Sequence, residues 1–116
     1  MKYSLYTATQ TNEIKTLFTK TFSDSEGEQE GQLIGQLVED LIGTTKAEDL
    51  YVFVATENEK IIGSILFTRL TFEADISIFL LAPVAVHTDY QGKGVGQALI
   101  NFGLQEMKKE GVELAF

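Results

Sequence analysis

The sequence contains no cysteine, a single proline and a single histidine in 116 residues. The absence of cysteine excludes disulfides, thiolate nucleophiles and cysteine-ligated metals, and it is typical of a protein from a reducing compartment. One histidine is too few for a histidine-rich metal centre, so we expect no metal. The N-terminal segment MKYSLYTATQ lacks the apolar core of a signal peptide, and no apolar run is long enough to span a bilayer. These absences favour a soluble cytoplasmic protein.

Basic residues are also scarce. Nine Lys and Arg stand against 17 Asp and Glu, for a formal net charge of -8. This balance argues against a nonspecific hold on nucleic acid or on an anionic membrane, so any bound anion must be held by local groups. The length and the 44% hydrophobic composition predict one domain that spans residues 1–116.

The hydrophobic pattern predicts an α/β (α+β) fold in the order β-α-α-β-β-β-α-β. Apolar residues at helical spacing indicate helices over 14–22, 32–43 and 95–109, and we expect Thr11 or Asn12 to cap the first. The acidic segment SDSEGEQEG, residues 23–31, is interpreted as a solvated loop. Runs rich in β-branched and aromatic residues predict the strands, which are 3–7, 50–55, 61–70, 76–86 and 112–116.

Two short features interrupt the predicted sheet. The polar residues Glu57, Asn58 and Glu59 suit a hairpin turn between two of the strands. Pro83 lies inside the strand over 76–86, and proline cannot donate to a ladder, so that strand is expected to bulge or to part from a neighbour there.

Three alternating glycines follow this interrupted strand and precede the last predicted helix, in the segment Gln91-Gly92-Lys93-Gly94-Val95-Gly96, here called the glycine corner. A helix N-terminus presents unpaired N–H groups and the positive end of the helix dipole. Glycines let an anion approach the backbone without obstruction from side chains. The glycine corner is therefore predicted to bind an anionic group such as a phosphate.

The spacing excludes the two common nucleotide motifs. A GxGxxG fingerprint that began at Gly92 would need glycine at Gln97, and one that began at Gly94 would need it at Leu99. A nucleoside-triphosphate loop requires Ser or Thr after Gly-Lys, but Gly94 follows Lys93.

The pattern Gln-x-x-Gly-x-Gly, preceded by the apolar strand LAPVAVH, resembles the acetyl-coenzyme A (acetyl-CoA) motif of the GCN5-related N-acetyltransferases, the GNAT superfamily. Among its members, LAPVAVHTDYQGKGVGQALI is most similar to the small bacterial YhbS-like N-acetyltransferases. The resemblance implies a GNAT-like mixed sheet. It also implies that the strand-end backbone hydrogen-bonds the pantetheine arm, and that the loop and the start of the helix receive the pyrophosphate. The implied cofactor-binding residues are Val84, Ala85, Val86, Gln91, Gly92, Lys93, Gly94, Val95, Gly96 and Gln97.

Several side chains near this motif allow two interpretations. Lys93 either adds positive charge near the phosphates or is a solvated surface lysine. Histidine side chains can exchange a proton near neutral pH, so His87 suits a catalytic base, but its place at a strand exit also suits a structural role. Tyr90 is interpreted as a packing residue that supports the loop.

Acetyl transfer to an amine requires removal of a proton from the acceptor, and no residue of this sequence is assigned as the base. Carboxylates are the candidates. The acids of residues 24–30 either attract a cationic amine or merely solubilise a loop, and Glu73 and Asp75 precede a strand. The family resemblance implies further elements after the strand that begins at Val112, including a tyrosine acid, and the sequence stops at Phe116.

Two functions fit these observations. The first is an acetyl-CoA-dependent N-acetyltransferase acting on the primary amine of a small molecule or peptide. The alternative is a catalytically impaired relative that binds CoA or self-associates. The expected last strand would lack a neighbouring strand, and the apolar stripe of Ile100, Leu104 and Met107 would be only partly covered. We therefore expect a homodimer that forms through the C-terminal strand and helix.

Overall fold

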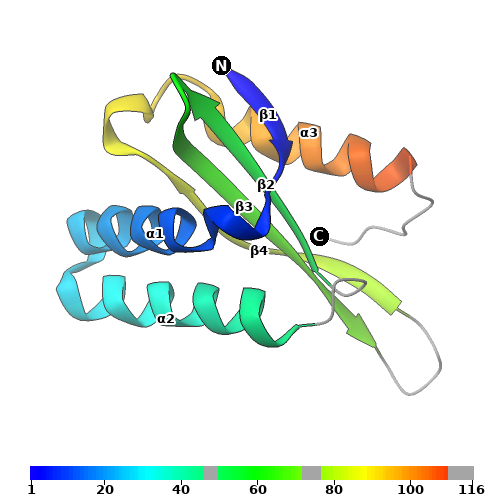
Figure 1. Ribbon diagram of the computed structural model, residues 1–116, viewed down its shortest axis with the longest axis horizontal. Helices are drawn as coiled ribbons and strands as arrows, with labels where there is room; N and C mark the ends of the chain where they lie inside the picture. Colours follow the sequence, from blue (N-terminus) through cyan, green and yellow to red (C-terminus); the bar gives the residue numbers. More distant parts are fainter. Residues whose placement is uncertain (46–49, 72–76, 110–116) are drawn as a thin grey trace.

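The computed structural model describes residues 1–45, 50–71 and 77–109, with residues 69–71 and 77–83 described as backbone only. It has the α/β fold class expected from the sequence, with three helices and a four-stranded sheet (Figure 1). The strands are β1 (Lys2–Leu5), β2 (Leu50–Glu57), β3 (Lys60–Thr71) and β4 (Ser77–Val86), and the helices are α1 (Thr11–Glu26), α2 (Glu28–Thr44) and α3 (Val95–Lys109).

The four described strands form an antiparallel meander in the order β1-β2-β3-β4. β2 and β3 meet in a tight hairpin, in which Glu57 lies opposite Lys60. Asn58 and Glu59 between them have φ angles of 51° and 67°, as in the two-residue turns whose twist matches that of the strands. The predicted turn is confirmed. The fifth strand that the sequence predicts, over residues 112–116, lies outside the described residues.

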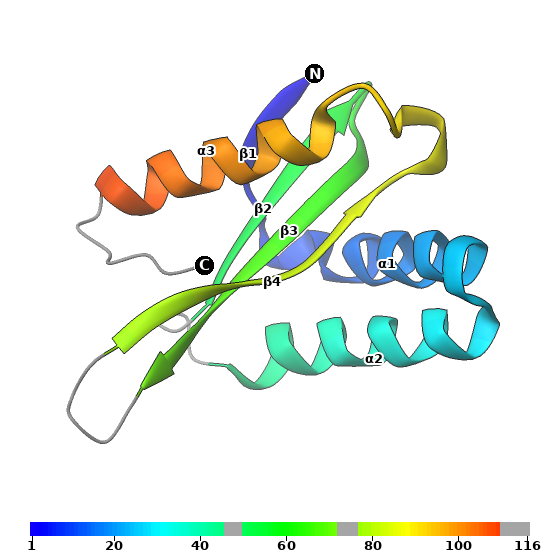
Figure 2. The same cartoon turned by 180° about the vertical axis from the view of Figure 1, so that it is seen from behind.

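The sheet is covered on both faces (Figures 1 and 2). Successive residues of β2 point to opposite sides, and Val52, Phe53 and Val54 are all fully buried. Val52 and Val54 belong to the core with α1 and α2, whereas Phe53 belongs to the core with α3. The chain therefore has three layers, and each helical layer has its own hydrophobic core.

The segment predicted as a loop over residues 23–31 is helical, which corrects the interpretation from the sequence. α1 continues to Glu26, and Gly27 alone makes the joint, with a φ of 103° that suits glycine. α2 then begins at Glu28, and the acids in its first turn lie at the positive end of the helix dipole. An acidic, glycine-containing pattern here marks a sharp helix-to-helix joint.

The predicted capping of α1 is also wrong. The helix begins at Thr11 itself, after a short 3-10 helix, Ala8–Gln10, and the Gln10 that precedes it makes no side-chain cap. The Thr11 hydroxyl instead donates to the carbonyl of Ala8 at 3.0 Å.

α1 and α2 pack closely because two glycines of α2 face α1. A Cβ on Gly31 would lie 1.9 Å from Ser23 Oγ and 2.5 Å from the carbonyl oxygen of Thr19. A Cβ on Gly35 would lie 2.0 Å from Thr19 Oγ1. The apolar residues of α2 lie in two environments, since Val38 is fully buried whereas Leu33 is 65% exposed.

The final helix has the predicted bounds. Its Leu99, Gly103 and Met107 are buried against the sheet, and Ile100 and Leu104 are half-buried beside them. Met107 is fully buried, which corrects the expectation of an open stripe at that position. No helix within the described ranges is both long and apolar enough to cross a membrane.

Candidate functional site

The strand that leads to the glycine corner is irregular at the expected place. Val84 of β4 lies opposite Ile65 of β3, but Leu81 lies opposite Phe67, so Ala82 and Pro83 together stand against a single residue. This is a β-bulge, and it confirms the break that the proline predicts. β4 is the last strand in the described sheet, so only one of its edges pairs with a described strand.

The three candidate residues at the end of β4 lie on alternate faces. Val84 and Val86 pack with the α3 core and are half-buried, whereas Ala85 is buried on the α1 side. Their side chains fill the two cores, so only their backbone groups are available to pair with an extended ligand at the strand edge.

The glycine corner has the backbone shape that an anion site needs. Gly92 and Gly94 both have a φ of 79°, and a Cβ built on either meets no atom within 4 Å. The space in front of both glycines is therefore open. The N–H of Ala98 donates to the Gly94 carbonyl at 3.0 Å, so the helical hydrogen bonding of α3 begins at Gly94. The N–H groups of the first turn then have no acceptor within the helix.

The other candidate residues at the corner differ in their contacts and exposure. Gln91 donates from Nε2 to the carbonyl of Val86 at 2.9 Å, so its side chain ties the corner to the strand end. Val95 is 4% exposed and packs in the α3 core, and a Cβ on Gly96 would lie 3.6 Å from Val86. Gln97 is exposed and donates to Asn101 one turn further along α3. Only the backbone of these helix residues is positioned to act on an anion.

The Lys93 ammonium lies 5.6 Å from the centroid of the Tyr90 ring. Tyr90 in turn contacts the ring of His87 edge-on, with centroids 6.1 Å apart, and packs against the α3 core. Tyr90 therefore supports the loop, as its interpretation from the sequence required. Lys93 is exposed at the corner, where its charge is accessible to a ligand.

His87 has a clear structural contact. Its Nδ1 accepts a hydrogen bond of 3.1 Å from the N–H of Asp89, which begins the 3-10 helix Thr88–Tyr90 between β4 and the corner. The side chain of Asp89 lies nearby, with Oδ2 3.8 Å from Nδ1. His87 thus caps the turn that positions the glycine corner, which supports the structural interpretation of this residue.

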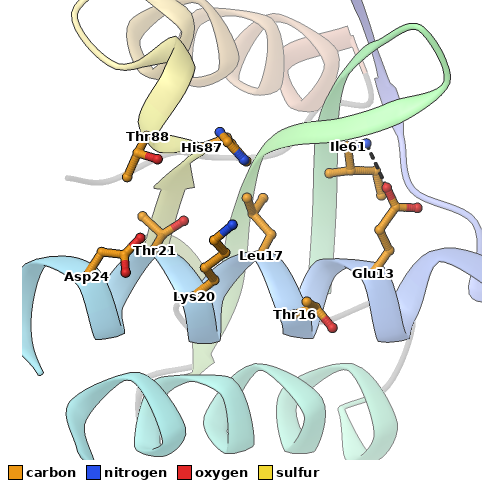
Figure 3. Close-up of a pocket in the computed structure, with 9 residues that line it drawn as sticks. All are labelled: Glu13, Thr16, Leu17, Lys20, Thr21, Asp24, Ile61, His87 and Thr88. Atoms are coloured by element: carbon orange, nitrogen blue, oxygen red, sulfur yellow. Dashed lines mark hydrogen bonds between the residues drawn. The ribbon is translucent and has the colours of Figure 1, made fainter. Parts of the chain in front are cut away.

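A cleft that the sequence did not predict lies on the α1 side of the same strand end (Figure 3). It has a volume of about 190 Å³ and lies between α1, Ile61 and His87, and we call it the α1 cleft. Its lining includes Lys20, Thr21 and Asp24, together with Thr88. One signal was present in the sequence: Thr21 is a polar residue within the apolar stripe of α1, and it is buried.

The remaining candidate groups are separate from the corner. The acids at positions 24, 26, 28 and 30 surround the α1–α2 joint and are all exposed. Glu73 and Asp75 lie outside the described residues. Among the residues that the structure describes, no three His, Asp or Glu side chains gather in a way that could hold a metal ion.

Comparison with known proteins agrees with this geometry. The model of the Acetyltransferase (GNAT) family matches residues 11–116. The uncharacterized N-acetyltransferase YjhQ of Escherichia coli strain K12 is 35% identical over 79 residues, which are 66% of this chain and 44% of that protein. The chain thus matches less than half the length of this curated relative.

Solved structures show the same fold. A GNAT family acetyltransferase from Brucella melitensis, in complex with acetyl-CoA, is 26% identical with a TM-score of 0.81, covering 96% of this chain and 70% of that one. An aminoglycoside acetyltransferase from an uncultured soil metagenomic sample, in complex with sisomicin, is 20% identical with a TM-score of 0.70. The match covers 99% of this chain and 74% of that one. The match of the family model to residues 11–116 shows that this chain belongs to the acetyltransferase (GNAT) family.

Proposed function

We propose that this protein binds acetyl-CoA at the glycine corner and transfers the acetyl group to a primary amine of a small molecule or peptide. The observation that carries the proposal is the corner itself: two glycines with a φ of 79° and open space before them precede the first turn of α3. The acetyl-CoA complex of the Brucella relative supports the choice of ligand.

The backbone of this chain supplies most of the proposed binding groups. N–H groups of the first turn of α3, with the loop from Gln91 to Gly94, receive the pyrophosphate, and helix dipole and amides act together there. Lys93 adds a positive charge at the rim. The backbone of Val84, Ala85 and Val86 pairs with the amides of the pantetheine arm beyond the bulge. This arrangement lets neutral amides hold an anion in a protein of net charge -8.

The reaction joins the amine nitrogen to the thioester carbonyl carbon and breaks the carbon–sulfur bond, which releases the CoA thiol. An amine is mostly protonated at neutral pH, so a group must take its proton before attack. We assign this role to no residue, since His87 already accepts from Asp89 through Nδ1 and the acids of residues 24–30 lie around the helix joint.

The acceptor is proposed to be cationic in its resting form. Asp24, Glu26, Glu28 and Glu30 are exposed together at the α1–α2 joint, and their field attracts a protonated amine and repels an anionic one. A cytoplasmic location and a homodimer through α3 and the C-terminal residues stay predictions. Sedimentation at micromolar concentration tests the dimer.

The glycine corner is tested by thermal unfolding with acetyl-CoA. We expect acetyl-CoA to raise the melting temperature, because a ligand that binds only the folded state stabilises it. Gly94→Asp should abolish that increase, since the carboxylate would fill and repel the anion site. Gly43→Asp is the matched control, because Gly43 also has open space before it but lies at the end of α2.

One further ligand and a turnover assay extend this test. Acetyl-pantetheine lacks the pyrophosphate, so its weaker effect should be insensitive to Gly94→Asp. An acetyl-CoA effect that survives Gly94→Asp would remove the glycine corner as the site. Release of CoA thiol with a panel of amines then separates an active transferase from a relative that only binds CoA.

A further inference from the structure

The α1 cleft contains a buried hydroxyl group that has no hydrogen-bond partner among the described residues. Thr21 is 7% exposed, and among the described residues no group forms a hydrogen bond with its side chain. Its side chain projects from α1 toward His87 in Figure 3. A buried polar group without a partner costs about 1–3 kcal/mol, so native structures seldom keep one without an ordered water or a ligand beside it.

Two exposed charged side chains of opposite sign lie beside Thr21. Lys20 and Asp24 both line the cleft from α1, and neither has an ion-pair partner among the described residues. They are four residues apart on one helix, but the order with the cation first is the weaker one for pairing. In Figure 3 the Lys20 side chain is directed toward His87, and the Asp24 carboxylate lies beside Thr21.

The opposite wall adds donors. The Nδ1 atom of His87 accepts from Asp89, so in the neutral imidazole the proton is on Nε2, which can donate. Thr88 adds a hydroxyl at the rim. On the other side of the cleft, one oxygen of Glu13 is already occupied by the N–H of Ile61, at 2.8 Å.

Apolar groups complete the lining. Leu17 and Ile61 are each 6% exposed and border the cleft. The volume of about 190 Å³ is below the range of about 300–1,000 Å³ that is typical of pockets for drug-sized ligands. The cleft therefore fits a small metabolite with a short apolar part.

From these features we propose that the α1 cleft binds a zwitterionic α-amino acid with a small apolar side chain. Its carboxylate contacts Lys20 and the Thr21 hydroxyl, its ammonium group contacts Asp24, and its side chain lies against Leu17 and Ile61. A simple anion would meet Asp24, and a simple cation would meet Lys20, so a ligand with both charges is favoured over either. The site is on the opposite face of the sheet from α3. It shares Asp24 with the acids proposed to attract the acceptor, but Lys20, Thr21 and the apolar wall have no part in the proposed function.

Calorimetric titration of the whole chain tests the proposal with valine and two analogues of similar shape. Isobutylamine lacks the carboxylate and 3-methylbutanoate (isovalerate) lacks the amine. We expect valine to bind at least about tenfold more tightly than either, because each analogue leaves one charged side chain without its partner. Equal binding of valine and one analogue would overturn the zwitterion assignment.

Variants then locate the site. Lys20→Met and Asp24→Asn should each weaken valine binding about tenfold or more, and Thr21→Val about three- to tenfold. Lys108→Met and Thr44→Val are matched controls outside the cleft, and both should bind valine normally. Thr21→Val also reports on folding, since its melting temperature without ligand should be unchanged or higher.

Acetyl-CoA binding distinguishes this proposal from the proposed function. Lys20→Met and Thr21→Val should leave acetyl-CoA affinity unchanged, while Gly94→Asp should leave valine affinity unchanged. The cleft assignment would be refuted if all three cleft variants bound valine with unchanged affinity. It would also be refuted if the protein bound acetyl-CoA but not valine, and either result would leave the proposed site at the glycine corner unaffected.

Discussion

The side-chain amide of Gln91 donates a hydrogen bond of 2.9 Å to the carbonyl of Val86, and so joins the glycine corner to the last residue of β4. The main chain makes few other ties here, among them a weak one of 3.4 Å from the Gln91 N–H to Thr88. Gln91 therefore acts by positioning the corner against the strand end, through a contact that exists without any ligand.

Replacing Gln91 with methionine tests this positioning role, because methionine keeps the length of the side chain and removes the donor. We expect acetyl-CoA binding to weaken about three- to tenfold, the value of one hydrogen bond. We also expect faster amide hydrogen exchange at Gly92 and Gly94 in the ligand-free protein. Gln36→Met on α2 is the control, and unchanged exchange at the corner would contradict the role.

The exposed acids at the α1–α2 joint are predicted to favour cationic acceptors. Replacing Asp24, Glu26, Glu28 and Glu30 with their amides should lower kcat/KM for polyamines or basic peptides, because the field that concentrates cations is removed. The loss should fade as salt rises, since exposed charges are screened beyond about 10 Å at 0.1 M. If anionic amines are the better acceptors of the unaltered protein, the proposal of a cationic acceptor fails.

The glycine corner could be predicted because its signal is local. The motif from Gln91 to Gly96 and the strand before it lie within one short segment, and Pro83 marks the bulge directly. The structure supplies what the pattern could not, namely that Gly92 and Gly94 have positive φ angles and that Val95 is a core residue.

The α1–α2 joint and the α1 cleft could not be predicted, for two physical reasons. Acidic residues and glycine are typical of loops, but around Gly27 the acids lie at a helix N-terminus and one glycine makes the whole turn. The cleft joins Thr21 to His87, which are far apart in sequence, so only the packing of α1 on the strand end brings them together.

Packing of α3 on the sheet depends on Gly103. A Cβ at this position would lie 2.7 Å from Phe67 Cε2 and 3.0 Å from Phe53 Cδ2, and both rings are buried. Gly103→Ala should therefore lower the free energy of unfolding by about 1–3 kcal/mol, as overpacking does. Denaturant unfolding measures the change. Gly43→Ala is the control, since its Cβ meets no atom within 4 Å and alanine favours a helix, so no loss is expected there.

Close approach of α1 and α2 makes the sharpest prediction on stability. A Cβ on Gly31 would lie 2.5 Å from the Thr19 carbonyl oxygen and 2.7 Å from the Ser23 nitrogen, which are backbone atoms of α1, as well as 1.9 Å from Ser23 Oγ. Gly31→Ala must therefore push the two helices apart, and we expect a loss of about 3 kcal/mol, at the upper end of the overpacking range.

A second change shows which contact limits this approach. Ser23→Ala removes the hydroxyl but leaves both backbone atoms in place, so the double variant Gly31→Ala with Ser23→Ala should recover only a small part of the lost stability. Full recovery would mean that the hydroxyl alone sets the helix separation, and it would contradict a backbone-to-backbone contact. Because the glycine corner lies on the α3 side of the strand end, the folded double variant should still bind acetyl-CoA with the affinity of the parent protein, which calorimetry below its melting temperature can measure.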